Sequence, residues 1–424
     1  MDAVGTAARD PRTLGAKALK ILYLLTQSLD SPSGLGRYAP LARQLGKLGH
    51  QVTILALHPD FGRLSTRKQQ IEGVQIHYVS QMHVRKEGST KSYYSTPALL
   101  FHTVIATWRL SLAALRIKAD IIHICKPHPM NGIAGWIAHK LNGGELWVDC
   151  DDYEAASGRF NTSFQKNVVA SFEKALPRLA DHITTNTHFM EQKLVSWNSA
   201  CKRITYLPNG VDPGRFVTPD AAAIDALRRS LGLHGCQVVL YAGSLSLPSH
   251  PIPLLIEAFQ LALEKRPQTR LVIVGGGEDY AALQELVDKL RLGETVRFCG
   301  RVPADEIVRY YHLADVSVDP VNDDDAARGR CPIKLFESWA CGVPFISADV
   351  GDRQLLLGEP PAGMLTSPGD ATSLAESLLE VLARPELGER MAQLGRQRLL
   401  SFTWKRLALN LQNSYSTNLS LKPK

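Results

Sequence analysis

Short apolar runs alternate with segments of helical periodicity along the first half of the chain. The runs of strand length are residues 20–25, 51–57, 121–124 and 146–148. Between the first two, Leu41, Leu45 and Leu48 recur at the spacing of one helix face, and residues 130–141 have the length of a second helix. Strands that are apolar throughout and alternate with helices are typical of a parallel sheet that helices cover on both faces.

The second half repeats this scheme more regularly. Its predicted strands are residues 237–242, 270–274, 295–299, 316–319 and 343–347. Leu283, Leu286, Val287 and Leu290 form the pattern of a helix packed on a sheet. The chain is therefore predicted to be an α/β protein with two Rossmann-like, doubly wound domains that face a cleft. Pro, Asn and Gly cluster at residues 207–216, where we expect the join.

These patterns divide the chain into four predicted segments. They are a tail at 1–18, an N-terminal domain at 19–208, a C-terminal domain at 209–402 and a helix at 403–424 that returns to the first domain. A length of 424 residues suits two domains of ordinary size.

Composition narrows the class of protein. Charged residues make up 21% and hydrophobic residues 45%, which is typical of a globular chain. No run of about 18 apolar residues is apparent, and residues 1–17 lack the apolar centre of a signal peptide, so we expect a cytoplasmic protein. The seven cysteines form no C-x-x-C pair and are odd in number, which favours reduced thiols over a metal site or a disulfide framework.

The positive charge is concentrated in one window. Between residues 60 and 118, nine Lys or Arg stand against three Asp or Glu, so this window holds most of the formal net charge of +7. Such a region can attract anionic lipid head groups, and hence a membrane, or an anionic acceptor. A solvated loop is the alternative. No zinc finger, aromatic RNA-binding signature or basic helical arm is present, so nucleic acid is not an expected partner.

The segment CPIKLFESWACGVP, residues 331–344, is the most informative motif. Pro332 suits the first position of a helix, and Gly342 with Pro344 marks its end, so the spacing predicts a helix over 332–341. Lys334 and Glu337 then share one face near the helix start. Free backbone N–H groups and an ammonium group suit a diphosphate, and a carboxylate one turn later suits two ribose hydroxyls. The alternative is an exposed ion pair on a surface helix.

Glycine-rich loops follow several predicted strands, at the sheet edge where open α/β sheets bind ligands. In the second half these loops contribute candidate residues for binding a phosphate-containing donor ligand: Gly243, Ser244, His250, Gly275 and Gly276. In the first half, Gly34, Gly36 and Arg37 form a matching turn where an acceptor or the donor phosphates can meet the backbone. A plain tight turn is the alternative for the glycines at 275–277.

Charged residues near the strand ends add further candidates. Arg328 and Arg330 precede the 332–341 helix and can clamp a pyrophosphate. The Asp run at 323–325 has the composition of a metal site, but such runs are usually solvated, and we predict no metal and no cofactor. His128 and Asp152 follow first-half strands and can orient an acceptor hydroxyl, although a lone His is more often structural.

The common hydrolase and kinase motifs are absent. The sequence contains no G-x-S-x-G, H-E-x-x-H or G-x-x-x-x-G-K-[ST]. Nucleophilic hydrolysis and P-loop phosphoryl transfer therefore lose most of their support.

Taken together and in order, several segments resemble a known family. They are SGLGRY, LGKLGHQVTILAL, ADIIHI, LPNGVD, VIVGGGEDYAALQEL, VRFCGRVPADEIVRYYHLADVSVDP and KLFESWACGVPFIS. The chain resembles the retaining glycosyltransferases of the GT-B type, family four (glycosyl transferases group 1), over nearly its whole length. The resemblance implies that the second domain holds a nucleoside diphosphate sugar, with UDP or GDP, and that the first holds the acceptor, which is a glycan, a lipid or a small molecule.

The resemblance also implies roles for single residues. Lys334 would contact the diphosphate, Glu337 the ribose, and the segment from Arg297 to Arg301 the nucleobase. Leu335 is a further candidate for donor binding. Two departures stand out. Gly329 takes the place of a frequent Glu, and the GSLSLPSHP loop lacks the frequent Arg and Lys, so Arg328, Arg330 and Lys334 would replace those cations or the donor would differ. A sugar-nucleotide-binding protein without activity, or an epimerase or phosphorylase, is the alternative to a hexosyltransferase.

Overall fold

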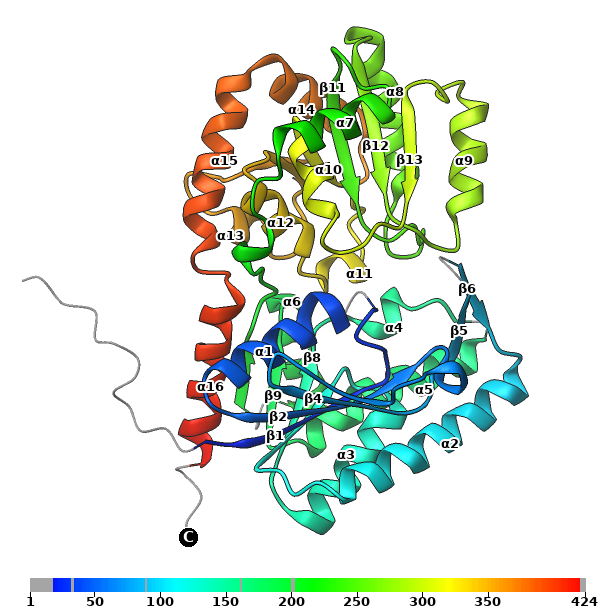
Figure 1. The fold of residues 1–424 in the computed structure, drawn as a ribbon, viewed down its shortest axis with the longest axis vertical. Coiled ribbons are helices and arrows are strands. Elements are labelled where there is room, and N and C mark those ends of the chain that lie inside the picture. The colour runs from blue at the N-terminus through cyan, green and yellow to red at the C-terminus, as the bar shows by residue number, and fades with distance from the viewer. Residues whose placement is uncertain (1–17, 32–33, 88–89, 161, 200–202, 420–424) are drawn as a thin grey trace, which may run out of the picture.

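The computed structural model describes residues 18–31, 34–87, 90–160, 162–199 and 203–419, and shows two α/β domains stacked one above the other (Figure 1). The predicted tail at 1–18 thus lies outside the described residues except for Ala18. The predicted fold class is confirmed, because each domain is built on its own mostly parallel sheet.

The N-terminal domain contains an eight-stranded sheet in the order β10-β9-β8-β7-β1-β2-β4-β3. The strands are β1 Lys20–Leu25, β2 Gln51–His58, β3 Lys68–Ile71, β4 Val74–Gln81, β7 Ile121–Cys125, β8 Glu145–Cys150, β9 His182–Thr185 and β10 Arg203–Tyr206. All pair in parallel except β3, which runs antiparallel to β4. A separate hairpin joins β5 (Val84–Glu87) to β6 (Thr90–Tyr93).

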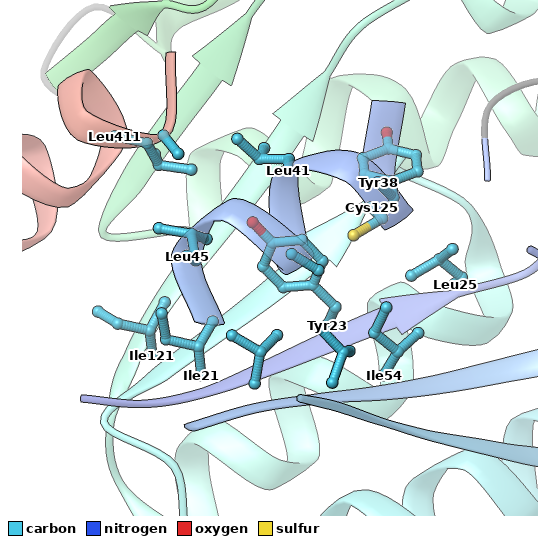
Figure 2. Close-up of a cluster of buried hydrophobic side chains, with 14 of the residues drawn as sticks. Ile21, Tyr23, Leu25, Tyr38, Leu41, Leu45, Ile54, Ile121, Cys125 and Leu411 are labelled. Carbon is cyan, nitrogen blue, oxygen red and sulfur yellow. The ribbon is translucent and has the colours of Figure 1, made fainter. Parts of the chain in front are cut away.

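Helices of this domain cover both faces of its sheet. They are α1 Ala39–Lys47, α2 Thr96–Leu115, α3 Pro129–Asn142, α4 Glu154–Ser157, α5 Ser163–Leu179 and α6 His188–Leu194. On one face, buried side chains of β1 and α1 such as Tyr23, Leu41 and Leu45 pack together (Figure 2). Leu411, from the far end of the chain, joins the same cluster.

The C-terminal domain contains a fully parallel six-stranded sheet in the order β13-β12-β11-β14-β15-β16. The strands are β11 Gln237–Ala242, β12 Thr269–Val274, β13 Val296–Gly300, β14 Val316–Asp319, β15 Phe345–Ala348 and β16 Met364–Thr366. Strand order reverses between β11 and β14. Loops that leave these two strands run to opposite sides, and ligands of open α/β sheets bind at such a point.

Helices also flank the second sheet, and the last one leaves the domain. They are α7 Ala221–Ser230, α8 Ile252–Lys265, α9 Tyr280–Lys289, α10 Ile307–Leu313, α11 Asp325–Arg328, α12 Ile333–Cys341, α13 Arg353–Leu357, α14 Ala371–Ala383, α15 Pro385–Leu399 and α16 Trp404–Leu419. Helix α16 packs beside α1 in the N-terminal domain (Figure 1). Its Tyr415 is fully buried, and the hydroxyl lies 2.9 Å from Nδ1 of His123 on β7.

The strand predictions are confirmed to within two residues at almost every boundary. β1, β11 and β14 have the predicted bounds, and α12 begins one residue later than predicted. Helix α2 and the strands β3 to β6 lie in the stretch for which we predicted only a basic region. The described cysteines are free thiols, in keeping with the expected reduced state.

Candidate functional site

Helix α12 points its N-terminal end toward the first domain. Leu335, Phe336 and Trp339 anchor the helix in the C-terminal core, and Gly342 ends it with φ of 69°, a left-handed conformation that favours glycine. At the other end, a Cβ added to Gly36 of the N-terminal domain would lie 2.6 Å from Cδ1 of Ile333, the first residue of α12. The free N–H groups of this helix therefore lie at the domain interface.

Lys334 extends from this end of α12 to the point where strand order reverses. Its Nζ lies 2.7 Å from Oδ1 of Asp319, the last residue of β14, and 4.4 Å from the ring centre of Tyr241 on β11. The side chain is only 11% exposed. Burial lowers the pKa of Lys334, and the neighbouring Asp319 carboxylate partly offsets this effect.

Asp319 also binds a second cation, Arg353, whose Nη2 lies 3.0 Å from Oδ2. Burial on its own would raise the pKa of Asp319, but Lys334 and Arg353 outweigh it and hold that pKa well below the ordinary value. Arg330 is close enough to act on both charges of the Lys334–Asp319 pair. Three cations thus surround one carboxylate, and the site has a net positive charge.

Two side chains at this site keep polar atoms without a hydrogen-bond partner among the described residues. Arg330 donates from Nη1 to the carbonyl of Ser249, but its buried Nε and Nη2 have no such partner. The buried Nδ1 of His250 also lacks one. Burial, followed by the charges of Arg330 and Lys334, lowers the pKa of His250, so its ring is neutral. An anion bound here would accept hydrogen bonds from the buried donors and balance the excess positive charge.

The glycine loops bring two backbones together beside Lys334. A Cβ on Gly275, where φ is 150°, would lie 1.8 Å from the carbonyl oxygen of Gly243. A Cβ on Gly243 would lie 3.3 Å from Nζ of Lys334. Glycine is therefore required at 275 by the close approach of the loops after β11 and β12. Ser244 and Gly276 belong to the same pair of loops.

Glu337 lies one turn further along α12. Its Oε2 accepts a hydrogen bond of 2.9 Å from the hydroxyl of Tyr311 on α10. Burial raises the pKa of Glu337, while Tyr311, Arg215 and Lys334 oppose that shift. Lys334 and Glu337 do not pair with each other, which removes the surface ion pair as an explanation of their spacing.

The structure moves three predicted donor-binding side chains away from this site. Arg297 donates to the carbonyls of Leu231 and Gly293 at the amino end of the sheet, so its predicted nucleobase contact is wrong. Arg328 is exposed and pairs with both oxygens of Asp323 instead of clamping a pyrophosphate. The side chain of Leu335 is fully buried, and only its backbone can reach a ligand. Arg301 is exposed after the carboxyl end of β13, where the prediction stands.

The side chain of Arg37 is structural, and the approach of an acceptor or of donor phosphates to the backbone of its turn stays a prediction. Its guanidinium is 1% exposed and forms two hydrogen bonds of 2.8 Å to the buried carboxylate of Asp149. It also donates to the carbonyl of Leu207 and to Oδ1 of Asn209, at the join of the domains. Gly34 packs against the backbone of Ser28. This turn therefore builds the interface, where Gly36 lies against Ile333 of α12.

His128 and Asp152 gather around a residue that the sequence analysis missed. Lys126 follows β7, is 4% exposed and has φ of 69°, which is rare outside glycine. Its Nζ lies 2.7 Å from Asp152 and 2.5 Å from Glu154. His128 directly precedes α3 and lies 3.5 Å from Glu154, and burial lowers its pKa. The position of Lys126 directly after a predicted strand was the signal that was available.

The three carboxylates at 323–325 do not gather around one point that could hold a metal ion. Asp323 pairs with Arg328, Asp324 caps α11, and Asp325 lies 3.0 Å from Lys193 of the N-terminal domain. In the described part of the chain, one group of carboxylates has the spacing of metal ligands: Asp151, Asp152 and Glu154. The Lys126 ammonium already lies among them, so their charge has a cation partner.

Gly329 lies against the other domain. A Cβ at this position would lie 3.0 Å from Cβ of Tyr153, the residue between Asp152 and Glu154. The N-terminal domain thus fills the space that a longer side chain at 329 would need.

Comparison with known proteins places this architecture in a family. A model of the glycosyl transferases group 1 matches residues 224–398, and a model of the glycosyl transferase 4-like domain matches residues 33–210. Together they cover most of both domains. The chain belongs to the glycosyltransferases of the GT-B type, family four-like, and its activity class is glycosyl transfer.

Individual relatives are distant. D-inositol 3-phosphate glycosyltransferase of Corynebacterium jeikeium is 25% identical over 314 residues, which are 70% of this chain and 72% of that protein. Sucrose-phosphate synthase from Thermosynechococcus elongatus shares the fold with a TM-score of 0.76 at 20% identity, over 95% of this chain and all of that one. Anabaena HepE, solved with UDP-glucose, gives 0.70 at 19% identity, over 95% and 99%.

Proposed function

We propose that this protein transfers a hexose from a UDP- or GDP-sugar to an acceptor hydroxyl with retention of the anomeric configuration. One observation carries the proposal: Lys334, Arg330 and the N-terminus of α12 meet beside Asp319, where strand order reverses and the net charge is positive. A diphosphate there would accept hydrogen bonds from the unpartnered N–H groups of Arg330. Glu337 would accept hydrogen bonds from the two ribose hydroxyls.

The chemistry needs these cations most when the donor bond breaks. The bond from the anomeric carbon to the diphosphate oxygen breaks, and a bond from the acceptor oxygen to that carbon forms. The acceptor proton passes to an oxygen of the leaving diphosphate. Negative charge that builds on the diphosphate is stabilised by Lys334, Arg330 and the helix N–H groups. Because these groups perform the neutralisation, we propose that the reaction needs no metal ion and no cofactor.

The N-terminal domain would supply the acceptor side. Asp152, His128 and Glu154 surround Lys126 at the carboxyl end of β7, and Tyr153 between them contacts Gly329 of the donor domain. We propose that Asp152 and His128 orient the acceptor hydroxyl. We also propose that the protein lies in the cytoplasm and that its 60–118 region contacts a membrane. The proposed acceptor is a glycan, a lipid or a small molecule.

A panel of UDP-, GDP- and ADP-sugars, scored by release of the nucleoside diphosphate with cell extract as acceptor, tests the function. Mass spectrometry of the product identifies the acceptor, and its anomeric configuration tests retention. EDTA should leave the rate unchanged.

The second candidate is a protein that binds nucleotide sugars without transferring them. The close packing of Gly329 against Tyr153 favours it, because this position carries no carboxylate and an added Cβ would crowd Tyr153. Such a protein would bind donor in a calorimetric titration but release no nucleotide with any acceptor.

A further inference from the structure

Helix α2 carries an apolar face that lies open to solvent. Leu100, Phe101, Val104 and Trp108 are 65%, 62%, 59% and 58% exposed. Positions 100, 104 and 108 recur every four residues, so their side chains line one face of the helix. In Figure 1 the helix runs along the outer edge of the N-terminal domain, away from the C-terminal domain. A contiguous exposed apolar face of this size marks an interaction surface.

Arginines border this face. Helix α2 contains no Asp or Glu over its 20 residues, and Arg109 is its single Lys or Arg. Arg67 and Arg109 lie 4.3 Å and 5.7 Å from the ring centre of Phe61, beside the helix. Arg85 lies 4.8 Å from the ring centre of Tyr94, just before the helix begins. Apolar and aromatic side chains bordered by arginines match a bilayer surface with anionic head groups.

The opposite face of α2 decides between lying on a membrane and crossing one. By length and composition, α2 is long and apolar enough to span a bilayer, which the sequence analysis did not recognise. However, Ala106, Leu110 and Ala114 are completely buried in the core of the N-terminal domain. A spanning position would remove these side chains from that core. Exposure of one face only is typical of a helix in the plane of the interface.

We propose that the exposed face of α2 inserts into the surface of a membrane that contains anionic phospholipid. Phe101, Trp108 and their neighbours enter the boundary of the acyl chains, while Arg85 and Arg109 contact lipid phosphates. The inference extends the proposed function, because a membrane-bound enzyme would take an acceptor that the membrane holds.

Flotation of the full chain with lipid vesicles tests the inference. Vesicles of phosphatidylcholine alone are compared with vesicles that also contain phosphatidylglycerol. The double variant Phe101→Ser/Trp108→Ser should bind the anionic vesicles at least tenfold more weakly. Phe164→Ser is the matched control, because Phe164 is 73% exposed on α5 of the same domain, and it should bind like the wild type. Arg109→Gln should weaken binding about fivefold at low salt.

Three results would overturn the inference. The first is that the wild-type protein does not float with anionic vesicles. The second is that Phe164→Ser loses as much binding as the double variant. Alternatively, sedimentation would show a dimer that the double variant dissociates, which would make the face a subunit interface. Titration of the same samples with UDP- and GDP-sugars separates the two proposals. Donor binding without vesicle binding contradicts only this inference, whereas vesicle binding without donor binding contradicts the proposed function.

Discussion

The ammonium group of Lys334 lies 2.7 Å from the buried carboxylate of Asp319. The pair joins the start of α12 to the end of β14 at the point where strand order reverses. Asp319 is 0% exposed and also binds Arg353. It therefore holds Lys334 in place at the site that we propose for the diphosphate.

Replacement of Asp319 by Asn should destabilise the protein. Lys334 and Arg353 would both lose their carboxylate partner inside the protein, and removing one member of a buried ion pair costs about 3–5 kcal/mol. Urea denaturation measures the loss. Asp323→Asn is the control, because Asp323 pairs with Arg328 in solvent, and its unfolding midpoint should not change. Equal midpoints for the two variants would contradict this account of Asp319.

Glu337→Gln should weaken the binding of UDP or GDP about ten- to hundredfold, since a hydrogen bond to a charged group contributes about 1.5–3 kcal/mol. The amide keeps the shape of the side chain but is uncharged and has a single acceptor oxygen, for which Tyr311 and the ribose hydroxyls would compete. Isothermal titration measures the affinity. Tyr311→Phe removes the protein partner of Glu337 and leaves the carboxylate, so its effect should be smaller. A Glu337→Gln protein that binds like the wild type would exclude the ribose contact.

Gly329→Glu should lower the stability of the closed domain interface by about 2 kcal/mol, as is usual for a side chain forced into occupied space. The added Cβ would crowd Tyr153. Thermal unfolding with Gly62→Ala as control measures this effect, because a Cβ at Gly62 meets nothing within 4 Å. In a Tyr153→Gly background the loss should shrink. If it stays the same, crowding by Tyr153 is not the cause.

Stability should fall as the pH drops from about 6.5 to 4. Burial lowers the pKa of His123 from 6.5 to about 4, so the unfolded chain binds a proton in this window and the folded chain does not. The free energy of unfolding is therefore fully retained above pH 6.5 and decreases by about 3 kcal/mol toward pH 4. His123→Asn should make this slope shallower, and the buried His128 and His250, whose pKa values burial also lowers, should account for the slope that remains. His234→Asn, at an exposed position, should preserve it; a slope that both variants retain would exclude His123 as its source.

Much of the fold and part of the site could be predicted from sequence because their causes are local. Apolar runs and helix signals determine β1, β11, β14 and α12. The helix signals at Pro332 and Gly342, with the spacing of Lys334 and Glu337, then predicted that these two side chains share one face of the helix.

Roles that depend on distant partners could not be predicted. Arg37 is structural because it meets Asp149, which lies 112 residues away. The anchors of Arg297 are carbonyls at the amino end of the sheet, and no sequence pattern shows where a long side chain bends. Lys126 was missed because its importance comes from carboxylates that a second strand brings to it.

The turnover of Lys334→Ala tests the central claim most directly. With the donor and acceptor found in the panel, release of nucleoside diphosphate should fall roughly 100-fold, the scale for removing one charge partner of the transition state. Lys193→Ala, which removes another lysine at the domain interface, should keep its turnover within a fewfold of the wild type. Equal turnover for Lys334→Ala and the wild type would contradict the assignment of the diphosphate to α12.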